Sequence, residues 1–389
     1  LTIAPGVILF GGTGQSWLKV NRGNRINASG TQAAPIVFTS RDNVLGLNDD
    51  TSQGQWGGVV LSGRARTTDC RFGSVAADTC ERDTEGAADP GIYGGRDDTY
   101  NAGTMRYVQI RYSGFNLSPN SELQGLTTQS IGSGTTLEYI QAHNSSDDAM
   151  EFFGGVINMR GYVSTGADDD SIDVDTGARM DVQDVILIQR PGRGDALFEI
   201  DSNGNEADTP RTRLRIANFI AIQTLTSPDN EANATASLFF RGNSDTTLIN
   251  GIVISPQNEC IRMNGSGTTP ATLTARSVVM QCGTTKYRGT GSYTAAQVEG
   301  FFGSGSNNNN DAFTPTLTAL FLNGTNEDAV TAFDLTTLVP ASTLFANKSP
   351  NRVGAAWTGN NSWYTGWTCN SGYANFGSAS TSCSSLPTT

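Results

Sequence analysis

Short apolar runs separated by polar turns recur along the chain. In its centre, TLEYIQAHNSSDDAMEF, NMRGYVSTGADDDSIDV and MDVQDVILIQRPGRGDALFEID each contain an apolar strand, a polar turn and a second apolar strand. Leu137, Met159 and Met180 follow one another at nearly equal intervals, and Asp173 follows Glu151 at the same interval. Core and turn positions return together, so the pattern predicts a repeat of about 22 residues.

A unit of this length with two or three short strands cannot bury its own apolar side, so it must stack on its neighbours. Stacking predicts an all-β fold, a right-handed parallel β-helix (a solenoid with about 22 residues per coil) that carries loop insertions and a C-terminal cap. A β-propeller needs about 40–45 residues per blade, and the leucine-rich repeat pattern is absent, so both alternatives are less favoured.

Two parts are predicted along the chain. Residues 1–291 form the β-helix, and residues 292–389 form the last coils, short helical insertions and a Trp-rich cap. A polar stretch at 67–103 interrupts the repeat and is predicted to be a protruding loop. Helical spacing at 294–302 and 327–338 predicts the short helices. The segment WTGNNSWYTGWTC is interpreted as the lid that closes a solenoid end, with a carbohydrate-stacking patch as the alternative.

The composition argues against helices, against nucleic acid as a partner and against a transmembrane segment. The 45 glycines and the low charged fraction of 16 % favour strands and tight turns over helices. With 37 acidic and 25 basic residues the net charge is −12, which repels a polyanion and argues against nucleic acid. No apolar run approaches the roughly 20 residues needed to cross a bilayer, so we expect no transmembrane segment.

Six cysteines fall into three pairs that are close in sequence, and none forms a C-x-x-C motif. This favours disulfides over zinc and predicts an oxidising compartment, extracellular or on the outer cell surface. The predicted pairs are Cys70 with Cys80, Cys260 with Cys282, and Cys369 with Cys383. Because one repeat length separates Cys260 from Cys282, we expect them at the same angular position on adjacent coils.

Four phrases resemble a group of bacterial secreted or outer-surface right-handed parallel β-helix proteins, many of them described only as lipoproteins or as uncharacterised. The phrases are GTQAAPIVFTS, WGGVVLSG, NSSDDAMEFFGG and VGAAWTGNNSWYTGWT. The resemblance implies the fold and an extracellular location, and it transfers no catalytic residue.

The repeat stacks acidic residues along one edge of the solenoid. Like charges about 5 Å apart repel strongly, so either their pKa values are raised or a cation neutralises them. Oxygen ligands in turns suit Ca²⁺. The predicted calcium ligands are Asp147, Asp148, Glu151, Asp169, Asp170, Asp173 and Asp175. The alternative is that these carboxylates only accept hydrogen bonds from turn N–H groups.

These features favour an extracellular or cell-surface structural and binding protein with calcium-binding acidic turns. The chain begins at LTIAPG, which already resembles a coil strand, so self-association through the N-terminal solenoid end is a further expectation. A carbohydrate-binding module using Tyr107, Tyr112 or Trp363 as stacking platforms is another reading.

The alternative function is a polysaccharide-active enzyme, and whether the protein is an enzyme stays open. A glycoside hydrolase would use Asp148, Asp170 and Asp173, with His143 as a further candidate, because NSSDDAME and ADDDSID loosely resemble polygalacturonase motifs. A lyase would combine Ca²⁺ with an arginine base. The candidates for that base are Arg160, Arg179, Arg190 and Arg193.

Overall fold

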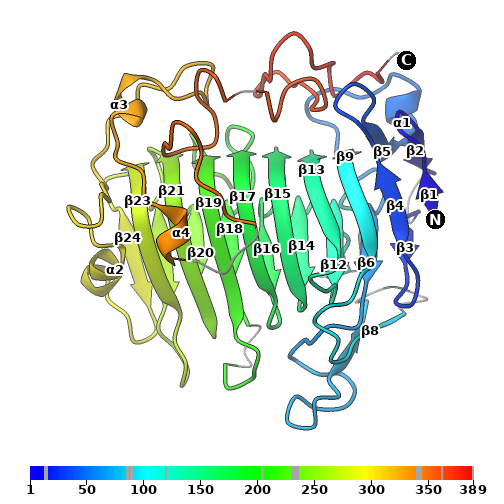
Figure 1. Cartoon of the computed structure of the whole chain (residues 1–389), viewed down its shortest axis with the longest axis horizontal. Helices are drawn as coiled ribbons and strands as arrows, with labels where there is room; N and C mark the ends of the chain where they lie inside the picture. The colour runs from blue at the N-terminus through cyan, green and yellow to red at the C-terminus, as the bar shows by residue number, and fades with distance from the viewer. Residues whose placement is uncertain are drawn as a thin grey trace.

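Two large parallel sheets, joined coil by coil, form the solenoid of the computed structural model (Figure 1). The structure describes residues 1–12, 16–84, 87, 91–118, 121–202, 206–228, 236–338, 344–360 and 362–387. Consecutive coils pair in parallel, for example Leu137 with Met159. The right-handed parallel β-helix predicted from the repeat is confirmed.

Sheet A contains the longer strands. In spatial order these are β1 (Thr2–Ile3), β4 (Ile26–Ser29), β9 (Gly103–Arg111), β13 (Thr136–His143), β15 (Val156–Thr165), β17 (Arg179–Ile188), β19 (Thr212–Ile222), β21 (Ser244–Ser255) and β23 (Thr272–Cys282), with β2 (Ile8–Gly11) and β5 (Ile36–Ser40) joined through β9.

Sheet B contains the shorter strands. They are β3 (Leu18–Val20), β6 (Val59–Ser62), β12 (Leu126–Gln129), β14 (Met150–Phe153), β16 (Asp173–Asp175), β18 (Phe198–Ile200), β20 (Leu238–Phe240), β22 (Ile261–Asn264) and β24 (Tyr287–Thr290).

The coil length is less regular than the sequence suggested. Leu137 pairs with Met159, one predicted repeat later, but Met159 pairs with Val182 and not with Met180. Met180 instead pairs with Ile157 on that coil, and its partner on the next coil is Leu214, which lies well beyond one predicted repeat. Stacking requires only that the strands match, so turns between the sheets vary in length without disturbing the ladder.

Apolar side chains form columns inside the solenoid. One column runs through in-register positions of sheet A, all buried: Met159, Val182, Ile216, Leu248 and Ala275. Burying a large aliphatic side chain contributes about 1.5–3 kcal/mol. Each coil therefore gains its stability from the coils above and below it.

The long strands of sheet A bend at single left-handed residues that the pairing register skips. Asn218 (φ 53°) and Asn250 (φ 52°) are examples from adjacent coils. Asn tolerates this conformation better than most residues. Other bend positions in this ladder are Tyr107, Tyr139, Gly161, Asp184 and Ser277.

Helix α2 (Ala295–Phe302) covers the C-terminal end of the solenoid. Thr294 and Gln297 form a capping box at its start, and Val298 and Phe302 are buried in the main core. The helical prediction for 294–302 is confirmed. Single-turn helices α3 (Thr325–Asp328) and α4 (Leu335–Leu338) overlap the second predicted stretch, and α1 (Arg41–Val44) follows β5.

The Trp-rich C-terminal segment lies along the side of sheet A and not over a solenoid end, so the predicted lid is wrong in its place. In Figure 1 the orange and red trace returns from the β23 end toward the β5 end. Trp367 and Phe376 belong to the apolar cluster formed with Val163 and Ile220. The segment reaches the first coils, where Gln32 Nε2 donates to the carbonyl of Ser362 at 2.9 Å. The side of sheet A carries aliphatic residues that have to be covered, whereas helix α2 already covers the C-terminal end of the solenoid. The division at residue 291 stays a prediction.

The predicted loop 67–103 contains an antiparallel hairpin, β7 (Glu81–Asp83) and β8 (Ile92–Gly94). It packs on sheet B where we expected it to stand clear. Lys19 Nζ donates to Thr84 Oγ1 at 2.5 Å, and Thr84 Oγ1 donates to Gln129 Oε1 at 2.9 Å. Residues 85, 86 and 88–90 of this loop lie outside the described residues. A second hairpin, β10 (Asn116–Ser118) with β11 (Ser121–Glu122), precedes β12.

All three predicted disulfides form. The angular argument for Cys260 and Cys282 is nevertheless wrong. Cys282 pairs with Ser255 at the end of sheet A, whereas the N–H of Cys260 donates to the carbonyl of Lys286 at the start of sheet B. The bond spans two angular positions because this coil is longer than the predicted repeat.

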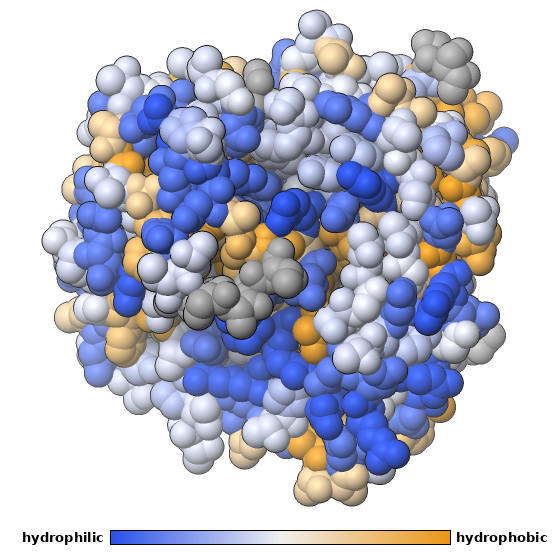
Figure 2. All heavy atoms as spheres, in the orientation of Figure 1, coloured by the Kyte–Doolittle hydropathy of each residue, from blue (hydrophilic) through white to orange (hydrophobic). Residues whose placement is uncertain are grey.

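The N-terminal end of the solenoid exposes apolar side chains. Leu1 is 59 % exposed and Phe10 is 56 % exposed. Figure 2 shows apolar residues gathered at the same edge of the molecule. Within the described part of the chain, no helix has the length and apolar character needed to span a membrane.

Candidate functional site

A cavity of about 250 Å³ lies on the outer face of sheet B over β12, β14 and β16. Met150 and Phe152 of β14 point into the core, so the alternating strand directs Glu151 outward. The carboxylates that line the cavity are Asp83, Glu122, Asp147, Asp148, Glu151, Asp169, Asp173 and Asp175.

The strand register builds one acidic row. Glu151 pairs with Asp173 and Asp173 with Glu199 on successive strands. Neighbouring strands are about 4.8 Å apart, so these like charges are close neighbours. The stacking of Glu151 on Asp173 that the repeat predicted is therefore present.

The turns before these strands contribute a second set of carboxylates, which also support the backbone. The N–H of Asp170 donates to Asp148 Oδ1 at 2.9 Å, and the N–H of Ala196 donates to Asp170 Oδ1 at 2.6 Å. One oxygen of Asp148 and one of Asp170 therefore accept a hydrogen bond from a turn N–H group, which is the structural role that the sequence predicted as the alternative to calcium binding. Asp173 differs, because its Oδ1 is buried without a hydrogen-bond partner.

Electrostatics set this cavity apart. Burial, followed by repulsion from Glu122, raises the pKa of Asp147 to about 6. Burial and Asp147 raise the pKa of Asp169 to about 8, and burial with Asp201 raises the pKa of Asp175 to about 7. For the other four predicted ligands, burial and neighbouring carboxylates raise the pKa well above its ordinary value: Asp148, Glu151, Asp170 and Asp173.

Nearby arginines compensate this negative charge only in part. Arg241 opposes the rise in the pKa of Asp173, and Arg82 and Arg241 both oppose it at Asp175. The pKa values of both carboxyl groups nevertheless stay above their ordinary range. The cluster therefore favours bound protons or a bound cation.

Three groups of carboxylates have oxygens within 4.8 Å of one another. They are Asp147, Asp148 and Asp169; Asp148, Glu151 and Asp173; and Asp169, Asp170 and Asp195. These groups contain six of the seven predicted ligands, and Asp175 lies beside them in the cavity lining. Buried acidic clusters of this kind are able to hold a metal ion, with oxygen as the donor atom.

The hairpin of the 67–103 loop supplies one wall of the cavity. Arg82, Thr84 and Tyr93 line it together with Glu122 from β11. Sequence reasoning missed all four as site residues. Since the 67–103 loop lies far from the acidic repeats in sequence, only its docking on sheet B brings Arg82, Thr84 and Tyr93 there.

His143 does not belong to this cavity. His143 is the last residue of β13, and its Nδ1 lies 2.8 Å from Oγ1 of Thr165, the last residue of β15. Its ring stacks on Tyr373 of the C-terminal segment. Burial, with Arg111 and Arg190 nearby, holds the pKa of His143 well below its ordinary value. A buried histidine under the C-terminal segment is not available as a base for a ligand in the cavity.

The four arginines expected for a lyase are also elsewhere. Arg179 pairs with Asp98, and Arg160 bonds the carbonyl of Leu344. None of the four lines the described cavity. Tyr112 is fully buried, which removes it as a stacking platform.

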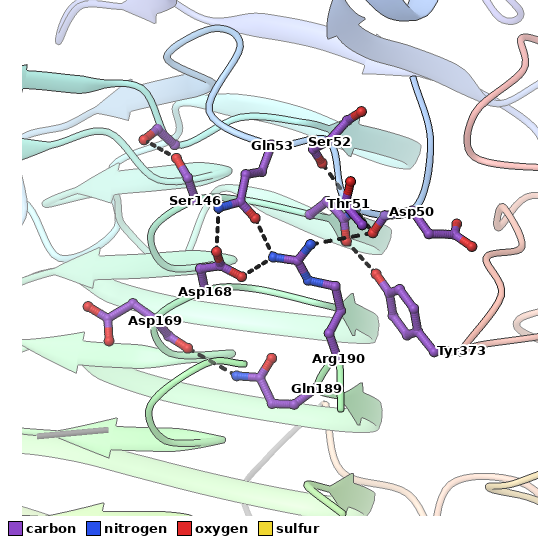
Figure 3. Close-up of polar contacts among 12 residues, drawn as sticks. Asp50, Thr51, Ser52, Gln53, Ser146, Asp168, Asp169, Gln189, Arg190 and Tyr373 are labelled. Carbon is purple, nitrogen blue, oxygen red and sulfur yellow. Dashed lines mark hydrogen bonds and ion pairs between the residues drawn. The ribbon is translucent and has the colours of Figure 1, made fainter. Parts of the chain in front are cut away.

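Arg190 holds the other side of the acidic turn (Figure 3). It forms an ion pair with Asp168 and a hydrogen bond with Gln53, and Gln53 also bonds Asp168. Asp169, the next residue, points away from this network in Figure 3, and its carbonyl accepts from Gln189 Nε2 at 3.0 Å. The network fixes the turn that presents Asp169 to the cavity.

Comparisons with known proteins add a family match. A family model described as a pectate-lyase-like β-helix domain matches residues 1–368. Among solved structures, the chain is similar to the crystal structure of alginate lyase from Paenibacillus sp. str. FPU-7, with 12 % identity over 71 % of this chain and 80 % of that chain. The TM-score is 0.23. The comparison with curated proteins gives no match.

Proposed function

The chain belongs to the family of pectate-lyase-like β-helix domains, and on this premise we propose that it is an extracellular protein that binds acidic polysaccharide through Ca²⁺ held in the sheet B cavity. The observation that carries the proposal is the convergence of carboxylates from successive coils around the unpartnered Oδ1 of Asp173. Three disulfides support an oxidising, extracellular setting.

The donor set supports calcium in particular. Ca²⁺ takes six to eight oxygen ligands in flexible geometry, whereas Mg²⁺ demands a near-ideal octahedron and zinc prefers nitrogen and sulfur. The three described groups offer carboxylates alone, and Asp148 is common to two of them. A bound ion would neutralise carboxylates that now repel one another, and it would attract the carboxylates of a uronate polymer.

Calorimetric titration with Ca²⁺ tests the cation site. We expect Glu151→Gln to weaken binding by on the order of tenfold or more, because it removes a charged ligand and its Coulomb attraction. Glu299→Gln is the matched control, since Glu299 is exposed on α2. Absence of calcium binding by the unaltered protein, or equal affinity in both variants, would contradict the proposal.

Turnover of the bound polymer is the second candidate function. A carboxyl group whose pKa lies near neutrality suits general acid catalysis, and burial brings Asp147 and Asp175 into that range. Of the three carboxylates named for a hydrolase, Asp148 and Asp170 each use one oxygen for a backbone N–H. Asp173 is therefore the best acid or base among them.

Product release from polygalacturonate distinguishes a hydrolase, a lyase and a binding protein from one another. A hydrolase produces new reducing ends alone, whereas a lyase also produces an ultraviolet-absorbing unsaturated uronate. Loss of either product in Asp173→Asn, with thermal stability retained, would support an enzyme. Polymer binding without products would support a binding protein.

A structural role with self-association rests on the exposed edge of β2. Phe10 of β2 is 56 % exposed, and among the described strands β2 pairs with β5 alone. Unpaired strand edges invite docking. Sedimentation of the protein and of Phe10→Asp tests this, and a concentration-independent monomer in both would contradict it.

A further inference from the structure

A second polar cavity, of about 380 Å³, lies where the C-terminal segment meets the first coils, and it shares no lining residue with the sheet B cavity. In Figure 1 the red end of the chain lies beside α1 at this edge of the molecule. One side of the cavity is the turn 48–50, and the other is the turn 370–372 together with Ser382 and Ser384. Every described lining residue except Gly372 has a side-chain oxygen, and none is basic. The lining therefore suits a hard cation.

The C-terminal side of this cavity is fixed by a disulfide. Cys369, directly before residues 370–372, is bonded to Cys383, which lies between the two serines. The N–H of Cys383 donates to the carbonyl of Asn370 at 2.7 Å. Asn43 Nδ2 of α1 donates to the carbonyl of Cys383 at 3.1 Å, which ties this side to the first coils. The two sides are therefore held together before any ligand binds.

The turn 48–50 contributes two carboxylates, each with one oxygen in use. Asp49 Oδ1 accepts the N–H of Thr51 at 2.8 Å, and Asp50 Oδ2 accepts the N–H of Gly372 at 2.7 Å. In Figure 3 the carboxylate of Asp50 points away from Arg190 and toward the C-terminal segment. A Cβ at Gly372 would lie 2.5 Å from Asp50 Oδ2, so this close approach requires glycine. Neither second carboxylate oxygen has a hydrogen bond or an ion pair to the described residues.

Two further oxygens of lining residues are buried without a hydrogen-bond partner, Asn48 Oδ1 and Ser371 Oγ. Asn48 is 9 % exposed, and its Nδ2 donates to Gln55 Oε1 at 2.9 Å. That bond identifies the oxygen as the end of the amide that lacks a partner. Buried polar atoms nearly always have a partner, so orphaned oxygens on both sides of one cavity indicate a ligand between them.

We propose that a calcium ion binds between the two sides of this cavity and fastens the C-terminal segment to the first coils. Its ligands are the second oxygens of Asp49 and Asp50, together with Asn48 Oδ1 and Ser371 Oγ. Ca²⁺ takes six to eight oxygens in flexible geometry, and water supplies the remainder at an open site. With two carboxylates the affinity belongs to the range of extracellular calcium modules, a Kd on the order of 10⁻⁴–10⁻³ M. The inference does not rest on the proposed function of the sheet B cavity.

The competing explanation is that water alone fills the cavity. The two explanations differ in how the C-terminal segment responds to calcium. Undocking of the segment separates Ser371 from the turn 48–50, so a bound ion opposes undocking and water does not. At a Ca²⁺ concentration of about ten times the Kd, the undocked state should be about tenfold less populated.

The experiment follows hydrogen exchange of residues 364–376 while Ca²⁺ is raised from chelator to about 10 mM, roughly ten times the weaker Kd. Exchange in the unaltered protein should slow by about tenfold. Asp50→Asn keeps an acceptor for the N–H of Gly372 and removes a charge, so it should lose most of this slowing. Its exchange in chelator should match that of the unaltered protein. Asp42→Asn, in α1 and outside the described lining, is the control and should slow like the unaltered protein.

Two further variants separate the sites and guard against misfolding. Asp49→Asn changes a carboxylate whose contacts lie within its own turn, and it should also lose most of the slowing. Glu151→Gln, in the sheet B cavity, should retain the slowing in full. No slowing in the unaltered protein, slowing that persists in both Asp49→Asn and Asp50→Asn, or slowing that is lost in Glu151→Gln would each overturn the inference.

Discussion

The backbone N–H of Asp170 donates to Oδ1 of Asp148, its counterpart one coil earlier, at 2.9 Å. The same oxygen position in Asp170 accepts the N–H of Ala196 in the next coil. A carboxylate ladder therefore holds the turns together while the remaining oxygens add to the charge of the cavity. Structural support and the proposed cation binding share these side chains, and substitutions are able to separate them.

Substitutions of Asp148 should separate its structural role from its proposed role in cation binding. Asp148→Ala leaves the buried N–H of Asp170 without an acceptor, and we expect a loss of about 1–3 kcal/mol in the free energy of unfolding. Asp148→Asn keeps an acceptor oxygen, so its loss should be smaller, while both variants bind Ca²⁺ more weakly. Urea unfolding without Ca²⁺ measures the first effect and calorimetry the second. Equal stability of the two variants would show that the hydrogen bond is unimportant.

The raised pKa values predict how stability depends on pH. The cavity aspartates have an ordinary pKa of 3.8, and burial raises the pKa of Asp147 to about 6, Asp175 to about 7 and Asp169 to about 8. Between the unfolded and folded pKa values the folded state binds more protons than the unfolded state, so stability should fall as pH rises from about 4 to 8. Bound Ca²⁺ favours the ionised forms and should reduce this fall.

Thermal unfolding across that pH range, in chelator and in excess Ca²⁺, measures both effects. Below the unfolded pKa the carboxyl groups are protonated in both states, so their stabilising contribution is fully present there and no longer changes with pH. A melting temperature that increases with pH in chelator would contradict the assigned direction of the shifts.

We expect the C-terminal segment to detach from the side of sheet A when Trp367 is replaced. Trp367 is fully buried in the lateral cluster. We expect Trp367→Ala to cost about 3–5 kcal/mol and to expose the segment to limited proteolysis after residue 313. Leu47→Ala, at a side chain that is 69 % exposed, is the control. Unchanged protease resistance would mean that other contacts hold the segment alone.

Substitutions of Asn250 test whether the left-handed bend strains the backbone of a residue other than Asn or Gly. Its Nδ2 donates to the carbonyl of Phe333 at 3.1 Å, and its Oδ1 accepts the N–H of Phe333 at 2.7 Å. Asn250→Ala loses both bonds and adds left-handed strain, whereas Asn250→Gly loses the bonds alone. We expect the Ala variant to be less stable by about 1 kcal/mol, as measured by denaturant unfolding. The reverse order would argue against strain at this position.

Local patterning by itself determined the solenoid and the acidic row. Alternation within β14 and β16 sends Phe152 and Val174 inward and Glu151 and Asp173 outward, and the regular repeat at that one step brings the two carboxylates together. Both facts follow from strand geometry, which depends on near neighbours in the sequence. The cysteine pairs were readable for a similar reason, since each closes a short loop.

Tertiary structure alone decided what surrounds that row. Met159 pairs with Val182 because turn lengths vary, and no local pattern reports a turn's length in space. Arg82 reaches the cavity only through an inserted hairpin docked on Lys19 and Gln129, and His143 is withdrawn beneath Tyr373 from the far end of the chain. Such long-range docking depends on shape and charge shared by distant segments, so the sequence predicted the acidic floor of the site while the fold supplied its wall.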